Sequence, residues 1–256
     1  MKNKLGFSIA GTTIGIAAVI FIIIASVLVI NGNNNATNYN NYDFNSIIEP
    51  DVHNGNIGDH VKGDKDAPVI VFEYADFQCP GCAAINTRVN DAIEKSNGKL
   101  AIVYRNYLLS YHQNGTAAAS AAEAAGLQGY WKEYANILFK NQTDWQYANA
   151  SERTTLFNQY FTEATNGKGD LTKFNQDIVS KNVSQKISFD MGIGKRINLP
   201  GTPSFYINGE RIDYANEEGG SVTIDGKIIT WDHVLSGEEF TNLLLDIVKA
   251  KTKDTK

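Results

Sequence analysis

Cysteine is scarce in this chain, with only Cys79 and Cys82 among its 256 residues. Two cysteines cannot form a structural disulfide framework, and a bridge between this pair would close too small a loop to stabilise the fold much. Positive charge is also in short supply, because the formal net charge is −5 and no basic stripe occurs. A nucleic-acid partner is therefore not expected, and the cysteine pair is expected to have a chemical role.

Metal ligands are few as well. One alternative for the cysteine pair is half of a zinc site, which needs about four nitrogen or sulfur ligands. The other candidate donors are histidines that show no paired ligand spacing: His53, His60, His112 and His233. We therefore predict no metal site, and we rank redox chemistry above zinc binding and above a purely structural pair.

Basic residues are missing between Lys4 and Lys62, and residues 5–30 carry no charge of either sign. As a helix, these residues would be roughly 39 Å long, enough to cross a hydrocarbon core of about 30 Å. The lysines before this segment place residues 1–4 in the cytoplasm and the remainder outside, by the positive-inside rule. We predict an uncleaved anchor over residues 1–30. A cleaved signal peptide is the alternative, but its apolar region is normally shorter.

The segment that follows the anchor, residues 31–56, is rich in Asn and Gly and is predicted to be a flexible stalk. The 43% hydrophobic content of the chain is enough for a core. The remaining length suits one large domain or one domain with an insertion. We place this domain at residues 57–250, followed by a polar tail at residues 251–256.

One stretch of sequence joins an apolar strand to a helix at the two cysteines. Residues 69–74 are apolar and β-rich, and Pro80 suits the first position of a helix, where no backbone N–H is needed. Cys79 then stands at the helix end whose unpaired N–H groups and positive dipole favour a thiolate, with Cys82 one turn further. We predict thiol–disulfide exchange, in which the Cys79 thiolate attacks and Cys82 resolves the mixed disulfide.

The order of the remaining elements implies a mixed central sheet with flanking helices and an inserted helical domain at about residues 110–198. A strand is expected at residues 99–107, followed by four or five helices at residues 114–198. A hairpin with an Asn-Gly turn at residues 204–213, a second hairpin with an Asp-Gly turn at residues 222–229 and a last helix at residues 236–248 complete the chain.

Together these features resemble the thioredoxin fold, and within it the DsbA-like branch of secreted thiol–disulfide oxidoreductases. The segment Phe77-Gln-Cys-Pro-Gly-Cys82 is similar to the active-site segment of that branch, and Glu73 matches its buried acidic residue. The helical block matches its inserted domain, and Gly201-Thr-Pro-Ser-Phe205 matches its cis-proline loop. The resemblance covers roughly residues 57–250 and implies an α/β, thioredoxin-like fold.

The resemblance also implies roles for individual residues. Glu73 is expected to be a buried proton acceptor that exchanges a proton with Cys82. Pro203 is expected to be a cis-proline, and the backbone of Thr202 is expected to pair with a substrate peptide like an added strand. The loop that faces the substrate would then consist of Pro80, Gly81, Thr202 and Pro203.

We expect a membrane-anchored, extracytoplasmic monomer that forms disulfides in reduced secreted or surface proteins, without a bound cofactor. The resemblance implies that a membrane quinone-linked thiol oxidase recycles it. A reductase or isomerase on the same fold is one alternative, because about 30 mV changes the equilibrium tenfold. A peptide-binding or chaperone module without enzymatic activity is another.

Two departures from the family pattern bear on these expectations. The dipeptide between the cysteines is Pro80-Gly81, without the histidine of strongly oxidising members, which leaves the redox potential open. Residues 214–231 form a longer segment than this fold needs before its last helix, and we expect a local elaboration there.

Overall fold

The computed structural model describes residues 37–235 and 237–252. The membrane anchor predicted at residues 1–30 lies outside this described part of the chain. None of the helices that are described is long and apolar enough to cross a membrane. The last helix, α9 (Glu238–Thr252), includes the first two residues of the predicted polar tail.

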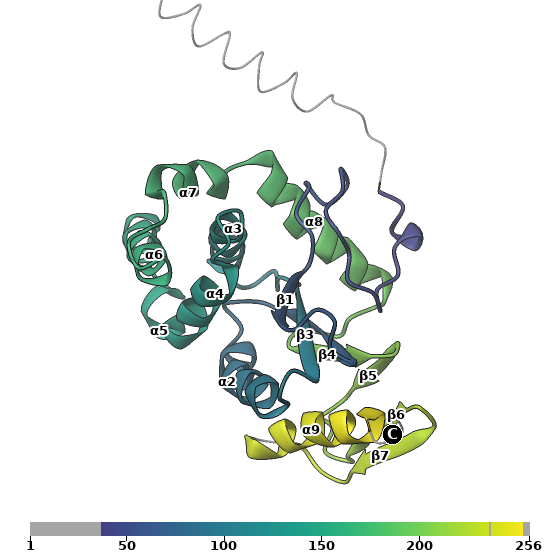
Figure 1. Cartoon of the computed structure of the whole chain (residues 1–256). Coiled ribbons are helices and arrows are strands. Elements are labelled where there is room, and N and C mark those ends of the chain that lie inside the picture. The colour runs from purple at the N-terminus through teal and green to yellow at the C-terminus, as the bar shows by residue number, and fades with distance from the viewer. Residues whose placement is uncertain (1–36, 236, 253–256) are drawn as a thin grey trace, which may run out of the picture. The chain divides into compact units, whose positions relative to one another are not determined.

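A mixed five-stranded sheet with the order β1-β3-β2-β4-β5 lies at the centre of the described residues (Figure 1). β2 and β3 are parallel, and the other neighbours are antiparallel. Every residue of β3 is buried, and only Ile70 of β2 is not, as is typical of parallel strands covered on both faces. The predicted mixed sheet is confirmed. Its strands are β1 (His60–Gly63), β2 (Val69–Ala75), β3 (Leu100–Asn106), β4 (Ser204–Ile207) and β5 (Glu210–Ile212).

Helices cover both faces of this sheet. On one face, α2 (Pro80–Lys95) and α9 form a core with the strands, in which Val71 and Leu244 are fully buried. On the other face, Phe189 of α8 (Lys181–Arg196) packs into a core with Phe72 and Tyr74 of β2. Burial of this apolar area on both sides supplies the main driving force for the fold, at about 25 cal/mol per Å².

The helices between β3 and α8 form a separate apolar core beside the sheet (Figure 1). The alanine-rich α3 lies at its centre, with Ala118, Ala121 and Ala125 fully buried, because small side chains allow neighbouring helices to approach closely. Phe77, Cys79 and Cys82 belong to the same core, so the cysteine segment contacts this insertion directly. The helices are α3 (Gly115–Gly126), α4 (Trp131–Lys140), α5 (Gln142–Trp145), α6 (Ala150–Ala164) and α7 (Leu171–Ile178).

The segment before β1 is packed on the domain, so the flexible stalk predicted at residues 31–56 is wrong for residues 39–56. The compact unit that contains the sheet begins at Tyr39. Arg105 of β3 donates from Nη1 to the Phe44 carbonyl and from Nη2 to the Ser46 carbonyl, both at 2.8 Å. Ile48 is 7% exposed. The prediction failed because the Asn-rich composition gives little weight to the aromatic side chains that pack here. It also gives no sign that the buried guanidinium of Arg105, in a distant strand, needs these carbonyls as acceptors.

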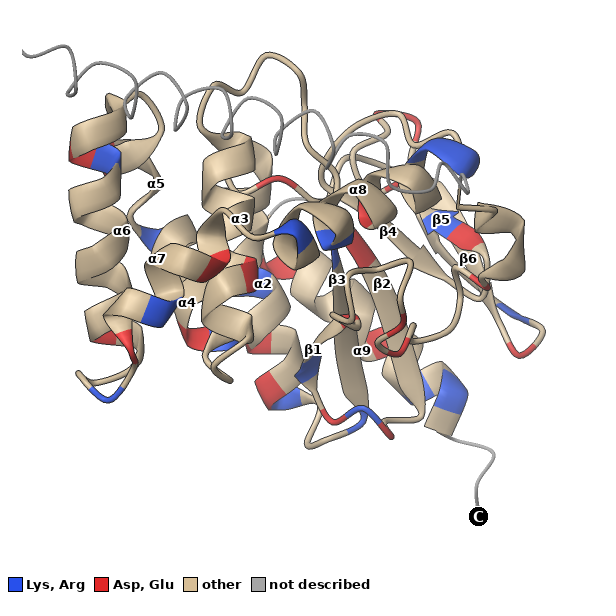
Figure 2. Cartoon of the chain, turned by 90° about the horizontal axis from the view of Figure 1, so that it is seen from above, with Lys and Arg blue, Asp and Glu red and all other residues tan. Residues whose placement is uncertain are grey.

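A buried network of charges joins this segment, the sheet and α8. Asp59 accepts from Arg105 Nη2 at 2.7 Å and lies 3.2 Å from Lys186 Nζ, which also contacts Asp190 at 2.8 Å. Glu123 of α3 accepts at 2.7 Å from the Asn106 side chain, which also donates to Asp190. Elsewhere on the described ribbon, basic and acidic residues are interspersed (Figure 2). Asp59, Asp190, Arg105 and Lys186 each lie against an opposite charge, and the second oxygen of Glu123 lies 2.7 Å from the His60 ring. The junction between sheet and insertion therefore tolerates their burial.

The elaboration expected at residues 214–231 is a hairpin of two strands, β6 (Gly220–Ile224) and β7 (Lys227–Trp231). Its turn has positive φ angles of 49° at Asp225 and 77° at Gly226, which suits the predicted Asp-Gly hairpin turn. Val222 and Ile224 are fully buried in the core that α9 and α2 share. The hairpin therefore extends that core beneath the last helix.

Candidate active site

Cys79 lies at the N-cap of α2, in extended backbone (φ −73°, ψ 121°), and Pro80 occupies the first turn as predicted. Its thiol donates to the Thr202 carbonyl at 3.3 Å. The Thr202–Pro203 peptide bond is cis, which confirms the predicted conformation of this loop. The side chain of Cys79 is nearly covered, at 7% exposure, and Cys82 is fully buried. Both thiols are free, so the structure shows the dithiol form.

The pKa values of the two thiols are shifted in opposite directions. The pKa of Cys79 is lowered to about 5, mainly by the hydrogen bond from the Cys82 thiol. Burial of Cys79 opposes this lowering, whereas the Thr202 side chain and the N–H groups of Cys82 and Gly81 contribute to it. The Thr202 hydroxyl is buried and has no hydrogen-bond partner among the described residues. Burial, followed by the neighbouring Cys79, raises the pKa of Cys82 well above its ordinary value. At neutral pH the pair is therefore one thiolate and one thiol.

Glu73 lies in the middle of β2, opposite Tyr104 of β3 and Phe205 of β4. Its side chain is 1% exposed, and neither carboxylate oxygen has a hydrogen-bond partner among the described residues. Burial raises the pKa of Glu73, although the charge of Lys62 opposes the rise. The charge of Glu73 also raises the pKa of Cys82, after burial and the neighbouring Cys79.

Lys62 of β1 is a second buried charge near the cysteines, and the sequence analysis did not identify it. It is fully buried, and its ammonium group donates to Asn86 Oδ1 of α2 at 2.7 Å. Burial lowers the pKa of Lys62, and the charges of Glu73 and Cys82 oppose this. A lone lysine in a short strand is more often exposed at a sheet edge, so only the tertiary packing reveals this residue.

The turn that leads into Cys79 is held by side chains from several elements. Asp76 accepts from the Gln78 N–H at 2.9 Å and from the His112 ring at 2.8 Å. Gln78, the residue before Cys79, accepts from the Asn114 N–H at 2.6 Å and donates to the Gln146 carbonyl at 2.8 Å. His112 and Asn114, to which we assigned no catalytic or binding role from sequence, thus support the active-site turn through Asp76 and Gln78.

The comparison with known families agrees with this geometry. The sequence matches the model of the thioredoxin family over residues 55–230. The chain belongs to the thioredoxin family. Residues 55–230 include both cysteines, Glu73, the helical insertion and the cis-proline loop, so the family match covers every residue of the candidate site, while α9 lies beyond it.

Solved structures share the fold of this thioredoxin domain at low sequence identity. The crystal structure of oxidised BdbD from Bacillus subtilis is 19% identical with a TM-score of 0.55, and the match covers 81% of this chain and all of that one, 100%. The α-DsbA1 structure from Wolbachia pipientis is 24% identical with a TM-score of 0.56, covering 77% and 94% of the two chains. The thiol–disulfide exchange protein α-DsbA2 from the same organism is 16% identical with a TM-score of 0.53, covering 74% and 84%.

The curated relatives are much longer proteins, of which only a part matches the thioredoxin domain. The Na⁺/H⁺ antiporter NhaA 1 of Mycolicibacterium gilvum is 31% identical over 156 residues, which is 60% of this chain and 24% of the relative. NhaA 3 of Salinispora tropica is 31% identical over 157 residues, 60% of this chain and 22% of the relative. The chain therefore spans about a quarter of the length of these relatives.

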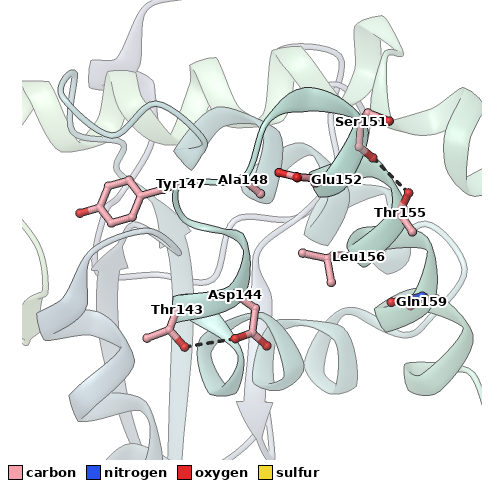
Figure 3. A pocket seen from close by; sticks show the side chains of 9 residues that line it. All are labelled: Thr143, Asp144, Tyr147, Ala148, Ser151, Glu152, Thr155, Leu156 and Gln159. Atoms are coloured by element: carbon pink, nitrogen blue, oxygen red, sulfur yellow. Dashed lines mark hydrogen bonds between the residues drawn. The ribbon is translucent and has the colours of Figure 1, made fainter.

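One cavity adjoins the thioredoxin site and another lies in the helical insertion. The first cavity, of about 210 Å³, lies between the cis-proline loop and the end of β5 with the segment after it. Thr202, which Cys79 contacts, lines it together with Arg211, Asp213 and Tyr214. The second cavity, of about 690 Å³, lies in the helical insertion, where the side chains of Asp144, Glu152 and Leu156 border it (Figure 3). Within residues 37–235 and 237–252, no group of three His, Cys, Asp or Glu side chains could hold a metal ion.

Proposed function

We propose that this protein is an extracytoplasmic thiol–disulfide oxidoreductase that forms disulfides in reduced secreted or surface proteins. The observation that carries the proposal is the position of Cys79, which lies at the N-cap of α2 and 3.3 Å from the Thr202 carbonyl of the cis-proline loop. The lowered pKa of Cys79, about 5, and the raised pKa of Cys82 support it. The assignment of Cys79 as the exchanging sulfur and of Cys82 as its partner rests on this polarity. Glu73 is assigned to exchange the proton of Cys82, because it is buried and its charge acts on that thiol.

The reaction begins from the oxidised protein, with a disulfide between Cys79 and Cys82. A substrate thiolate attacks the Cys79 sulfur, the bond between the two cysteines breaks, and Cys82 leaves with the electron pair and takes a proton, for which Glu73 is the nearby buried acid. A second substrate thiolate then attacks the substrate sulfur of the mixed disulfide, and Cys79 leaves as the thiolate. Two substrate thiols become one disulfide, and the protein becomes the dithiol.

The substrate chain is proposed to bind beside the cis-proline loop, where Thr202 and Pro203 face Pro80 and Gly81. Gly81 supports this arrangement, because a Cβ atom added to it would lie 3.2 Å from Pro203 Cδ and 3.7 Å from the Cys79 sulfur. The absence of a side chain at this position keeps the helix end close to the loop. The adjoining cavity of about 210 Å³ is suited to a residue that neighbours the substrate cysteine.

The acidity of Cys79 favours net oxidation over the alternative of a reductase or isomerase. A thiol with a pKa of about 5 instead of 9.0 is ionised at pH 7, which stabilises the reduced form by roughly two powers of ten and raises the reduction potential by roughly 60 mV. An oxidant that is regenerated has to pass its electrons on, and we propose a membrane quinone-linked thiol oxidase as the acceptor.

We also propose that residues 1–30 anchor the protein in a membrane with residues 1–4 in the cytoplasm. The uncharged run at residues 5–30 and the lysines that precede it support this proposal. Cell fractionation with protease protection tests it: the full chain is expected to sediment with membranes and to expose the thioredoxin domain on the outer side. Recovery in the soluble fraction would contradict the anchor.

Equilibration of the purified full chain with glutathione tests the direction of the chemistry. We expect a potential more oxidising than about −200 mV, together with faster oxidative refolding of a reduced model protein when glutathione disulfide is present. Cys79→Ser is expected to abolish that activity, whereas a peptide-binding or chaperone module would retain its function. A potential near the thioredoxin value of about −270 mV would contradict net oxidation.

A further inference from the structure

Gln142 links the helical insertion to the cysteine turn by two hydrogen bonds. It is the first residue of the short helix α5, and its side chain is 6% exposed. Its Nε2 group donates to the Phe77 carbonyl at 2.7 Å and to the Cys79 carbonyl at 3.0 Å. Both hydrogens of one side-chain amide are thus used on the backbone on either side of Gln78.

The Cys79 carbonyl is also the first acceptor of α2, because it accepts the Ala83 N–H at 3.1 Å. The amide of Gln142 occupies the second acceptor site of the same oxygen. It thereby fixes the peptide plane at which the helix begins, and with it the direction of the first N–H groups of α2. Those of Gly81 and Cys82 are the ones that act on the Cys79 sulfur.

The two carbonyls depend on the amide to different degrees. Without it the Phe77 carbonyl would lose this donor, whereas the Cys79 carbonyl would keep the Ala83 N–H. A buried acceptor that loses its donor destabilises the folded state, so the turn would be expected to rearrange if the amide were removed.

We propose that Gln142 is a positioning residue for disulfide exchange, which holds the Phe77 and Cys79 carbonyls so that the Cys79 sulfur meets the helix N–H groups and Thr202. The inference rests on the proposed function, and it makes the helical insertion part of the exchange site. Gln142 does not touch the sulfur, so its effect on chemistry is exerted through the backbone of the turn.

The test compares the full chain with Gln142→Met, which has a side chain of similar length without donors, and with Gln128→Met as the matched control. Gln128 also lies in the insertion and makes two bonds to the backbone, donating to the Asp170 carbonyl at 3.0 Å and accepting the Asp170 N–H at 2.9 Å. The thiolate absorbance of the reduced proteins is titrated against pH. We expect Gln142→Met to raise the pKa of Cys79 by about 1, a tenfold loss of acidity, and Gln128→Met to leave it unchanged.

Other outcomes separate this inference from the proposed function. An acidic Cys79 in the unmodified protein and an equally acidic one in folded Gln142→Met would overturn the inference alone. A Cys79 that is not acidic in the unmodified protein would overturn the proposed function first. If Gln142→Met does not fold, the test uses the side-chain amide signals of Gln142 in the ¹H–¹⁵N spectrum of the unmodified protein. These signals are expected to shift as Cys79 titrates. Signals that do not move would contradict the inference.

Discussion

The Cys79 thiol and the Thr202 carbonyl meet at 3.3 Å although the two residues are separated by 123 positions in the sequence. The Thr202 side chain also helps to lower the pKa of Cys79, and its hydroxyl is buried with no hydrogen-bond partner among the described residues. The loop before β4 therefore contributes to the electrostatics of the helix end as well as to substrate contact. This relationship leads to the first prediction.

Thr202→Val keeps the shape of the side chain and removes its hydroxyl group. We expect the pKa of Cys79 to rise by roughly 1, because the thiolate loses one hydrogen bond of about 1 kcal/mol. The pH dependence of alkylation of the reduced protein measures this. Thr230→Val, on the exposed part of β7, serves as the control. An unchanged titration in Thr202→Val would remove the hydroxyl group from the account of Cys79 acidity.

The stability of the reduced protein is expected to depend on pH through Cys79. The folded pKa of about 5 lies below that of an unfolded thiol, 9.0, so thiolate formation stabilises the folded state at neutral pH. At pH 7 this amounts to about 2–3 kcal/mol, and it is lost as the pH falls through about 5. Urea denaturation of the reduced protein and of Cys79→Ser at pH 7 and pH 4 measures the difference. A difference that does not change between the two pH values would contradict the assignment.

Glu73→Gln is expected to fold, because it replaces a buried carboxyl by an amide of the same shape. Without the carboxyl proton of Glu73, the departure of Cys82 from the attacked disulfide, and so the formation of the mixed disulfide, should slow by about a hundredfold, the low end of general acid–base effects. Stopped-flow measurement of that step with a model peptide is the test. Glu94→Gln, on the exposed side of α2, should behave as the unmodified protein. Equal rates for all three proteins would exclude Glu73 from proton transfer.

Lys62→Met removes the buried cation that opposes the rise in the pKa of Glu73. We therefore expect that pKa to rise further in the variant, so that the carboxyl group remains protonated to higher pH. The infrared band of the protonated carboxyl, assigned by its loss in a Lys62→Met, Glu73→Gln double variant, reports the titration. A downward shift of the Glu73 pKa would show that the two charges do not interact as described.

Asp59→Asn breaks the buried contacts with Arg105 and Lys186 and leaves two cations with one carboxylate fewer. We expect a loss of about 3–5 kcal/mol in the free energy of unfolding at pH 7. The charges of Lys186 and Arg105 lower the pKa of Asp59 against its burial, so its contribution is present above the ordinary carboxyl pKa and is lost as the pH falls through the folded value. The difference between the two proteins should therefore shrink as the pH falls below the ordinary carboxyl pKa and through the lowered folded value.

Chemical denaturation at several pH values measures this loss. Asp246→Asn, which removes the exposed partner of Lys249, is the control and should change the free energy of unfolding by less than about 0.5 kcal/mol. Equal effects of the two substitutions would mean that the Asp59 network does not stabilise the junction between the sheet and the insertion.

The sequence by itself determined the elements whose signals are local. The apolar run of β2, the proline after Cys79 and the helical spacing beyond it predicted the strand-to-helix junction, and the structure confirms it. The Asp-Gly turn likewise predicted the hairpin of β6 and β7. In each case the deciding interactions lie within a few residues, so hydrophobic periodicity and turn chemistry are sufficient.

Only the tertiary structure decided which distant residues surround the cysteines. Lys62 and Gln142 have no local signal, because each acts through a contact with another element: Asn86 in α2 for the first, and the Phe77 and Cys79 carbonyls for the second. Residues 39–56 were similarly misjudged, since their composition is typical of a flexible linker and their order depends on acceptors that Arg105 needs. Burial gives these polar groups their effect, and burial is a property of the packed chain that no single segment carries.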